Sequence, residues 1–299
     1  MGAWDFRKDI LALANRLGSV MPKRFQRSIS DFPGVLRILE KISAGRYVEV
    51  TSPEHYRIVL NPLFHSNLVS AGNLDAYEPE LRRVVTELTR PSMVAYDIGA
   101  NVGVFTFLLA RLVGSSGAVY AFEPEGNNFT CLQRSVQLNG TSNVRVDKRA
   151  IGQNSGTALF DRRGGAFSGR LVGDNTNYQR SANLTAVQTA SIDDLIRKEG
   201  FAPPDIVKID VEGNEALVLA GMRDTLTSHS PIIVCELHKH LGESAGAVQT
   251  ILRECGYSVY SVKDVANMKD HGCVSLADLS QETHVVARRT HPTQTPPTN

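Results

Sequence analysis

Apolar runs of about five residues alternate along the chain with segments whose apolar positions recur every three to four residues. The first kind of pattern predicts a buried strand, and the second predicts a helix. The predicted strands are 46–50, 55–60, 94–97, 118–123, 144–151, 205–210, 231–237, 258–262 and 284–288. The predicted helices are 4–17, 77–90, 104–112, 127–139, 215–226 and 245–254. Strands that alternate with helices in this way favour an open α/β sheet of mostly parallel strands.

Two regions depart from this alternation. The strands 258–262 and 284–288 lie too close in sequence for a helical crossover, so we expect them to pair antiparallel at the edge of the sheet. Residues 152–190 are rich in glycine, asparagine, serine and threonine, and we expect a long loop there. Loops of that length are usually functional, so we interpret 161–183, which contains several arginines, as a mobile lid over a binding site.

The two ends of the chain differ from its central part. Residues 4–17 are amphipathic, which favours packing against the main domain or a partner; peripheral contact of 4–27 with a membrane is the alternative. Residues 290–299 are rich in proline and threonine and are expected to form a disordered tail. The predicted organisation is therefore an α/β N-terminal extension at 1–73, one domain at 74–289, and the tail.

Composition narrows the class of protein. The 299 residues carry a net charge of +1, which gives no electrostatic support for a nucleic-acid partner. The four cysteines show no C-x-x-C spacing, which is typical of reduced thiols and predicts a cytoplasmic location. No apolar run reaches the length of a membrane span, and no signal-peptide pattern occurs. These features leave the oligomeric state open.

A glycine-rich turn carries the main chemical signal. Asp97 ends a predicted strand, and Gly99, Asn101 and Gly103 precede an apolar helix. Glycine lets a backbone approach a ligand closely, and the first N–H groups of the helix then face that ligand. A dinucleotide turn requires G-x-G-x-x-G, whereas this turn has the pattern D-x-G-x-N-x-G. It resembles the first motif of S-adenosylmethionine (SAM) methyltransferases, in which an acidic group suits the ammonium of the cofactor and would repel a pyrophosphate.

Glu123 ends the next predicted strand, roughly twenty residues after the glycine turn. At this spacing a carboxylate usually binds ribose hydroxyls. The alternative is a structural carboxylate at the start of the following helix, before Pro124. The glycine turn upstream favours the ribose interpretation.

Further polar side chains follow two other strands. Asp210 and Glu212 follow one strand, and Glu236 and His238 alternate along the next. Ligands bind at the carboxyl ends of such strands, so these side chains are expected at one edge. His238 is the preferred general base because its pKa lies near neutrality, with Asp210 and Glu236 as the other catalytic candidates; a solvated loop histidine is the alternative reading of His238. No metal is expected, although Asp210, Glu212 and Glu236 would suit a divalent cation.

Six motifs occur together along the chain. They are Y-E-P-E from Tyr77, D-I-G-A-N-V-G from Asp97, F-E-P from Phe122, S-I-D-D-L from Ser191, I-V-K-I-D-V-E-G-N-E from Ile206 and I-I-V-C-E-L-H from Ile232. In this order they resemble the FkbM family of SAM-dependent methyltransferases over roughly residues 74–262. The resemblance implies a class I, Rossmann-like fold: a mostly parallel seven-stranded sheet with an antiparallel edge strand.

The resemblance also implies an activity and a set of site residues. SAM is the expected cofactor, and O-methylation of a sugar, glycan or small-molecule hydroxyl is the expected reaction. The expected cofactor-binding residues are Glu78, Asp97, Gly99, Asn101, Gly103, Glu123 and Asp210. A nucleobase amino-methyltransferase is disfavoured, because its Asn/Asp-Pro-Pro-aromatic loop is replaced here by Asp210-Val-Glu-Gly. A catalytically silent SAM-binding or partner-docking module on the same fold is the alternative.

Overall fold

The computed structural model describes residues 45–289 apart from a set of internal gaps. The gaps are 63, 66–67, 70–73, 75–76, 162–169, 173–183, 238–244 and 267–282. The predicted helix 4–17, the predicted tail 290–299 and the candidate base His238 lie outside the described residues. The same is true of most of the proposed lid 161–183.

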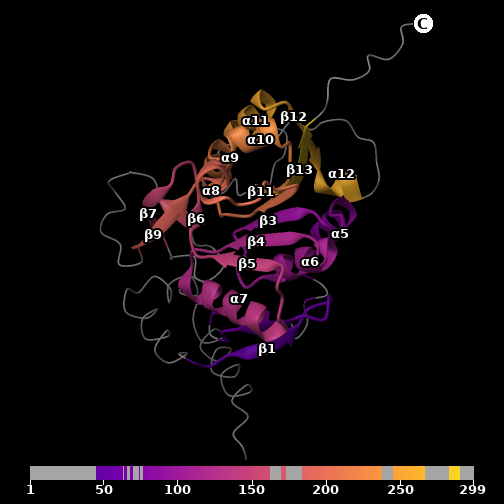
Figure 1. The fold of residues 1–299 in the computed structure, drawn as a ribbon, viewed down its shortest axis with the longest axis vertical. Helices are drawn as coiled ribbons and strands as arrows, with labels where there is room; N and C mark the ends of the chain where they lie inside the picture. The colour runs from indigo at the N-terminus through magenta and orange to yellow at the C-terminus, as the bar shows by residue number, and fades with distance from the viewer. Residues whose placement is uncertain are drawn as a thin grey trace, which may run out of the picture.

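Seven strands form the central sheet in the order β12-β13-β11-β10-β3-β4-β5 (Figure 1). Their bounds are β3 Val94–Ile98, β4 Ala118–Phe122, β5 Val144–Asp147, β10 Ile206–Ile209, β11 Ile232–Leu237, β12 Tyr257–Ser261 and β13 Thr283–Arg289. Neighbouring strands from β5 to β11 are parallel, and β13 is antiparallel to both β11 and β12. The predicted antiparallel pair at the sheet edge is confirmed, with β12 outermost and β13 one strand inside it.

Alternation of side chains along the strands builds a core on each face of this sheet. In β10, Val207 and Ile209 join one hydrophobic cluster, and Ile206 joins the other. The first cluster includes residues of α8 (Ile192–Glu199), α9 (Glu215–Ala220), α10 (Arg223–Ser228) and α11 (Ala245–Glu254). The second includes residues of α5 (Pro79–Leu88), α6 (Val104–Val113) and α12 (Val262–Ala266). Helices on both faces make the sheet a doubly covered α/β layer.

The N-terminal hairpin packs onto the main domain. Strands β1 (Val48–Thr51) and β2 (Arg57–Leu60) pair antiparallel, as the two predicted strands of the N-terminal extension suggested. Buried side chains of the hairpin share a hydrophobic cluster with α7 (Gly126–Asn139), and the Val59 amide donates to Ser135 Oγ at 2.8 Å. Figure 1 shows β1 beside α7. The boundary at residues 73 and 74 stays a prediction.

The region predicted as a long loop contains a second sheet, so that prediction was wrong for its described part. The strands β6 (Ala150–Ile151), β7 (Gly156–Asp161), β8 (Arg170–Val172) and β9 (Leu184–Ala190) pair in the order β6-β9-β7-β8. The polar composition of this region concealed them, because β7 and β9 each have only two buried residues and are held by six mutual residue pairs. The predicted strand 144–151 accordingly divides between the two sheets.

The predicted helix 215–226 also divides, into α9 and α10. The chain turns at Gly221, where a Cβ would lie 2.1 Å from the carbonyl oxygen of Gly152. This close backbone approach requires glycine. The break therefore comes from the neighbouring second sheet, which the local sequence does not reveal.

Candidate active site

The glycine turn lies against the end of β10. Gly99 has a φ of 78°, and a Cβ at this position would lie 1.8 Å from the backbone oxygen of Asp210. Gly103, with a φ of 98°, is the N-cap of α6. Asn101 between them also adopts the left-handed conformation, with a φ of 51°. The turn thus brings the carboxyl ends of β3 and β10 together and points the start of α6 at the space between them.

Glu123 is held by backbone amides beside this turn. It is 5% exposed, and its two carboxylate oxygens accept hydrogen bonds from the amides of Asn101 and Glu125, both at 2.8 Å. Burial raises the pKa of Glu123 to about 8, against the opposing effect of these hydrogen bonds. The N-cap of α7 is instead Glu125, which accepts from the amides of Asn127 and Asn128. The capping role that was the alternative for Glu123 is therefore filled by its neighbour.

A cavity brings most of the expected cofactor residues together. Gly99, Asn101, Glu123 and Asp210 line it, and so does Glu212. Its apolar walls are Phe122, Ile151, Phe160 and Leu171, the last three from the second sheet. Ligand sites commonly combine apolar walls with a few oriented polar groups in this way.

One independent observation indicates that the cavity suits SAM. The side-chain oxygen of Asn101 is buried and has no hydrogen-bond partner in the described part of the chain. A buried polar atom without a partner is costly, so a ligand donor at this position would be stabilising. Apolar walls suit an adenine ring, and the acidic groups suit ribose hydroxyls and an ammonium.

Asp97, which was expected to bind the cofactor, lies outside the cofactor cavity. Its side chain is 0% exposed, accepts a hydrogen bond from Thr106 Oγ1 at 2.6 Å and lies 3.6 Å from Lys208 Nζ. Burial raises its pKa, and Lys208 and Thr106 oppose that shift. Asp97 does not line the cavity described above. The structure thus places it behind the glycine turn, where it connects β3 to α6 and β10.

Lys208 is a buried cation that lies between the carboxylates of Asp97 and Asp210. Its ammonium lies 3.1 Å from Asp210 Oδ2 and donates to the Gly99 carbonyl at 3.4 Å. Burial alone would lower the pKa of Lys208, but Asp210 and Asp97 raise it, so the side chain is a cation. A second hollow beside the turn is lined by Lys208, Asp210, Gly99, Asn101 and Tyr77.

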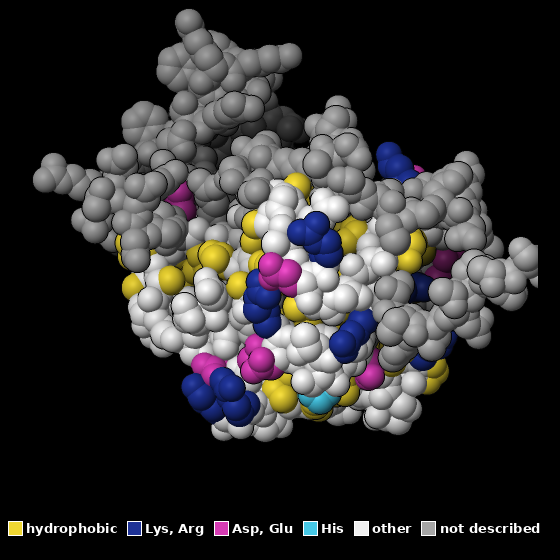
Figure 2. Space-filling model, turned by 90° about the horizontal axis from the view of Figure 1, so that it is seen from above, with side chains coloured by type: hydrophobic (Ala, Val, Ile, Leu, Met, Phe, Trp, Pro, Cys, Tyr) yellow, Lys and Arg dark blue, Asp and Glu magenta, His cyan; other side chains and the backbone are white. Residues whose placement is uncertain are grey.

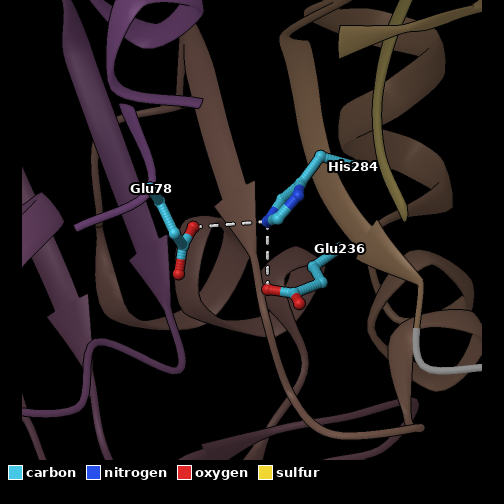
Figure 3. A group of neighbouring side chains, drawn as sticks. All are labelled: Glu78, Glu236 and His284. Atoms are coloured by element: carbon cyan, nitrogen blue, oxygen red, sulfur yellow. Dashed lines mark hydrogen bonds and ion pairs between the residues drawn. The ribbon is translucent and has the colours of Figure 1, made fainter. Parts of the chain in front are cut away.

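Glu78, Glu236 and His284 form a polar cluster, which we call the edge cluster (Figure 3). His284 Nε2 lies 3.1 Å from Glu236 Oε2 and 3.3 Å from Glu78 Oε2. Glu236 and His284 face each other across the β11–β13 ladder. The β10–β11 register pairs Ile209 with Cys235, the residues that come directly before Asp210 and Glu236. Tyr77 hydrogen-bonds to Glu78 and lines the hollow beside the glycine turn. The edge cluster therefore lies along the same sheet edge as the cofactor cavity.

The edge cluster differs from the three carboxylates that, on the sequence alone, would suit a divalent cation. Among the described residues, the three-member group whose ligand atoms lie within 4.8 Å of one another is Glu78, Glu236 and His284. Asp210 and Glu212, which the sequence offered with Glu236, do not belong to that group. The register explains the difference, because His284 is directly opposite Glu236, whereas Glu212 lies beyond the end of β10 in a left-handed turn.

Sequence reasoning missed His284 and Tyr77 as site residues. A signal for His284 was present, because an antiparallel last strand begins at the edge where its parallel neighbours end. Its first residues therefore belong to the ligand edge, and His284 is the second residue of β13. For Tyr77 the signal was only its position next to Glu78 in the Y-E-P-E motif.

His284 should make the stability of the protein depend on pH. Burial alone would lower its pKa, but hydrogen bonds and charges from Glu236 and Glu78 raise it to about 9, above the ordinary 6.5. A raised histidine pKa stabilises the fold fully below pH 6.5, and this stabilisation is lost as the pH rises through 9. We expect it to amount to at most about 3 kcal/mol.

Urea unfolding at pH 6 and at pH 9.5 measures this effect. The free energy of unfolding should fall more between the two pH values in the natural protein than in His284→Gln. Equal losses in both proteins would show that His284 is not a stabilising cation.

The face of the molecule drawn in Figure 2 carries basic and acidic side chains intermixed among polar and small hydrophobic areas. Among the described residues drawn on this face, the basic side chains lie apart from one another and beside acidic ones. Within the described residues no helix is both long and apolar enough to cross a membrane.

Fold and site together define a class of protein. The strand order, with one antiparallel strand inserted next to the edge, is that of the class I SAM-dependent methyltransferases, and the glycine turn and strand-end acids occupy the cofactor edge. A profile of the methyltransferase FkbM domain matches residues 97–259. The chain belongs to the FkbM methyltransferase family, which confirms the resemblance drawn from its motifs. SAM is accordingly its cofactor.

Two characterised relatives illustrate the range of the family. The chain is 29% identical over 201 residues to 31-O-demethyl-FK506 methyltransferase FkbM of Streptomyces tacrolimicus, covering 58% of this chain and 76% of that protein. It is 30% identical over 162 residues to the hexuronic acid methyltransferase AglP of Haloferax volcanii, covering 54% of this chain and 62% of AglP. The second match thus spans less than two thirds of the relative.

One alignment with a solved structure covers part of this chain at low sequence identity. The crystal structure of a methyltransferase FkbM from Methylobacillus flagellatus KT aligns with a TM-score of 0.43 and 16% identity. The alignment covers 75% of this chain and 60% of that one.

Proposed function

We propose that this protein transfers the methyl group of SAM to a hydroxyl of a sugar, a glycan or a small-molecule natural product. The observation that carries the proposal is the edge cluster, a pair of carboxylates and a histidine along the same sheet edge as the cofactor cavity. The names of the relatives, which include a hexuronic acid methyltransferase and a 2-O-methyltransferase, support an oxygen acceptor on a sugar. A net charge of +1 and buried, unpaired thiols at Cys131 and Cys255 support a small-molecule acceptor and a cytoplasmic location.

The ribose, adenine and ammonium groups of SAM each match the chemistry of a different part of the cavity. Glu123 accepts hydrogen bonds from the ribose hydroxyls, and Phe122, Ile151 and Leu171 enclose the adenine. Asp210, at the other side of Gly99, takes the ammonium of the amino-acid part. The support for this assignment is that Asp210 lines both the cavity and the hollow beside the glycine turn.

The methyl-transfer step requires a proton acceptor. The acceptor oxygen attacks the methyl carbon, the carbon–sulfur bond breaks with its electron pair going to sulfur, and the hydroxyl proton passes to Glu236. His284, which bridges Glu236 and Glu78, positions Glu236 and offsets the charge of the two carboxylates. Alignment of the reactants supplies much of the acceleration, on the order of 7–11 kcal/mol, and the base contributes about 10²–10⁴-fold.

A cation-assisted version of the same step uses the same three side chains. The 3.1 and 3.3 Å separations around His284 Nε2 are close to those of adjacent ligands around a six-coordinate divalent cation. Such a cation would lower the pKa of the acceptor hydroxyl. Methyl transfer that survives chelation by EDTA assigns the cluster to proton transfer, whereas loss that Mg²⁺ or Mn²⁺ restores assigns it to a cation.

A SAM titration followed by radiolabelled methyl transfer tests the proposed function. Calorimetry should give a dissociation constant in the micromolar range, about −8 kcal/mol at 1 μM. Transfer of the label to uronic acids, other sugars or polyketide alcohols would support the enzyme. Binding of SAM without transfer to any member of such a panel would favour the silent binding module, and binding of NAD in place of SAM would contradict the proposal.

Glu123→Ala should weaken SAM binding without unfolding the protein. Loss of the buried acceptor leaves the ribose hydroxyls without a partner, which costs about 1–3 kcal/mol, or roughly a 5- to 150-fold higher Kd. Calorimetry measures the Kd, and thermal unfolding without ligand serves as the control. A lower melting temperature with an unchanged Kd would show that Glu123 is only structural.

A further inference from the structure

His65 lies in the N-terminal segment, outside the residues 97–259 matched by the family profile, yet it reaches the wall of the cofactor cavity. It is 0% exposed. The Asn61 amide donates to its Nδ1 at 3.0 Å, and its Nε2 lies 2.9 Å from Asn128 Oδ1. Asn128 belongs to α7 and lines the cavity.

The protonation of His65 follows from these contacts. Burial lowers its pKa, so the ring is neutral at neutral pH. Nδ1 accepts a hydrogen bond, and a neutral imidazole carries its single proton on the other nitrogen. Nε2 therefore donates to Asn128 Oδ1, which leaves the amide nitrogen of Asn128 to donate elsewhere.

The Asn128 side chain connects His65 to Glu123, the candidate acceptor for the ribose hydroxyls. Asn128 is 2% exposed, and its side chain hydrogen-bonds to Glu123. The contact with Asn128 lowers the pKa of Glu123, which is the effect of a donor to its carboxyl oxygens, so the Asn128 group that meets Glu123 is the NH₂. Glu123 thus has three donors, from the glycine turn, the start of α7 and Asn128.

We infer that His65 is a positioning residue for the cofactor site, which acts through Asn128 to orient Glu123 towards the ribose hydroxyls of SAM. This inference rests on the proposed role of Glu123. It assigns a part of the cofactor site to the N-terminal segment, where the family motifs give no indication of one. Without the His65 donor, the buried oxygen of Asn128 loses the hydrogen bond at 2.9 Å, and the orientation of its NH₂ towards Glu123 is less strongly fixed.

Two substitutions at the same position separate the two contacts of the ring. His65→Asn keeps an acceptor near the place of Nδ1 for the Asn61 amide but does not reach Asn128. His65→Gln places an amide N–H near the position of Nε2 and keeps a donor for Asn128. We expect His65→Asn to raise the Kd for SAM about three- to tenfold and His65→Gln to restore most of this loss.

A control variant and a double-mutant cycle exclude a merely structural role. Leu60→Ala removes buried packing from the same hairpin cluster, so it should lower the melting temperature and leave the Kd unchanged. In the cycle, Asn128→Ala should raise the Kd, and adding His65→Asn should raise it no further, since both act on one chain of hydrogen bonds.

These measurements distinguish a failure of the His65 inference from a failure of the Glu123 assignment. A natural Kd in His65→Asn, or additive effects with Asn128→Ala, would overturn the inference while leaving the Glu123 assignment intact. An unchanged Kd in Glu123→Ala would overturn the proposed ribose role itself. An equal loss in His65→Asn and His65→Gln would also overturn the inference, because the donor to Asn128 would then be irrelevant.

Discussion

Glu236→Gln is expected to lower the rate of methyl transfer by about 10²–10⁴-fold while SAM still binds. Glutamine has nearly the same shape as glutamate but does not take up the acceptor proton. Glu236 is only 15% exposed at its side chain, and it is not among the residues that line the cofactor cavity. The Kd for SAM should therefore change little, and the loss should appear in the turnover rate at saturating SAM.

The measurement is radiolabelled methyl transfer with the acceptor that the panel identifies. A matched control is Glu254→Gln, which removes an exposed carboxylate paired with Arg223 at 2.9 Å on the far helix α11. This control should lose almost nothing, since exposed ion pairs contribute little. A Glu236→Gln protein with full activity would remove Glu236 from the mechanism, whether as a base or as a cation ligand.

Gly99→Ala is the second substitution for which we expect a large effect. An alanine at a φ of 78° costs about 1–2 kcal/mol, and its Cβ would lie 1.8 Å from the Asp210 carbonyl oxygen, so the turn or the end of β10 must move. Overpacking of this kind costs a further 1–3 kcal/mol or so. We expect the free energy of unfolding to fall by about 2–5 kcal/mol and SAM binding to be lost, because the turn and Asp210 both line the cavity.

Gly200→Ala provides the matched control. Gly200 has a φ of 70°, and no atom lies within 4 Å of the position that its Cβ would take. Alanine there bears only the conformational cost of about 1–2 kcal/mol and leaves the cofactor edge untouched. Urea unfolding and SAM calorimetry on both variants separate the two effects. Similar losses in both proteins, with SAM binding retained in Gly99→Ala, would show that the turn does not depend on contact with β10.

Each of two cations at this edge lies between two carboxylates. Lys208 lies between Asp97 and Asp210, and His284 lies between Glu78 and Glu236. Each cation thus offsets the negative charge of the two carboxylates beside it.

Local patterns in the sequence determined most of the central sheet. The apolar runs predicted all seven of its strands, and the D-x-G-x-N-x-G turn predicted the cofactor edge. The spacing from that turn singled out Glu123, which lines the cavity, and its role towards ribose stays a prediction. The strand predictions succeeded because strand alternation, the conformations that glycine adopts and the strand–turn–helix unit depend on residues close together in sequence.

Only the tertiary structure decided how distant residues meet. Glu78 and His284 come together because α5 begins, and β13 starts, at the edge where β11 ends, and His65 meets Asn128 because the hairpin packs on α7. The second sheet is held by pairing between β7 and β9, whose exposed side chains give no hydrophobic signal. Asp97 is buried behind the turn by its bonds to Thr106 and Lys208. Register and burial are properties of the packed chain, so a periodic pattern predicts the elements but not which of their side chains touch.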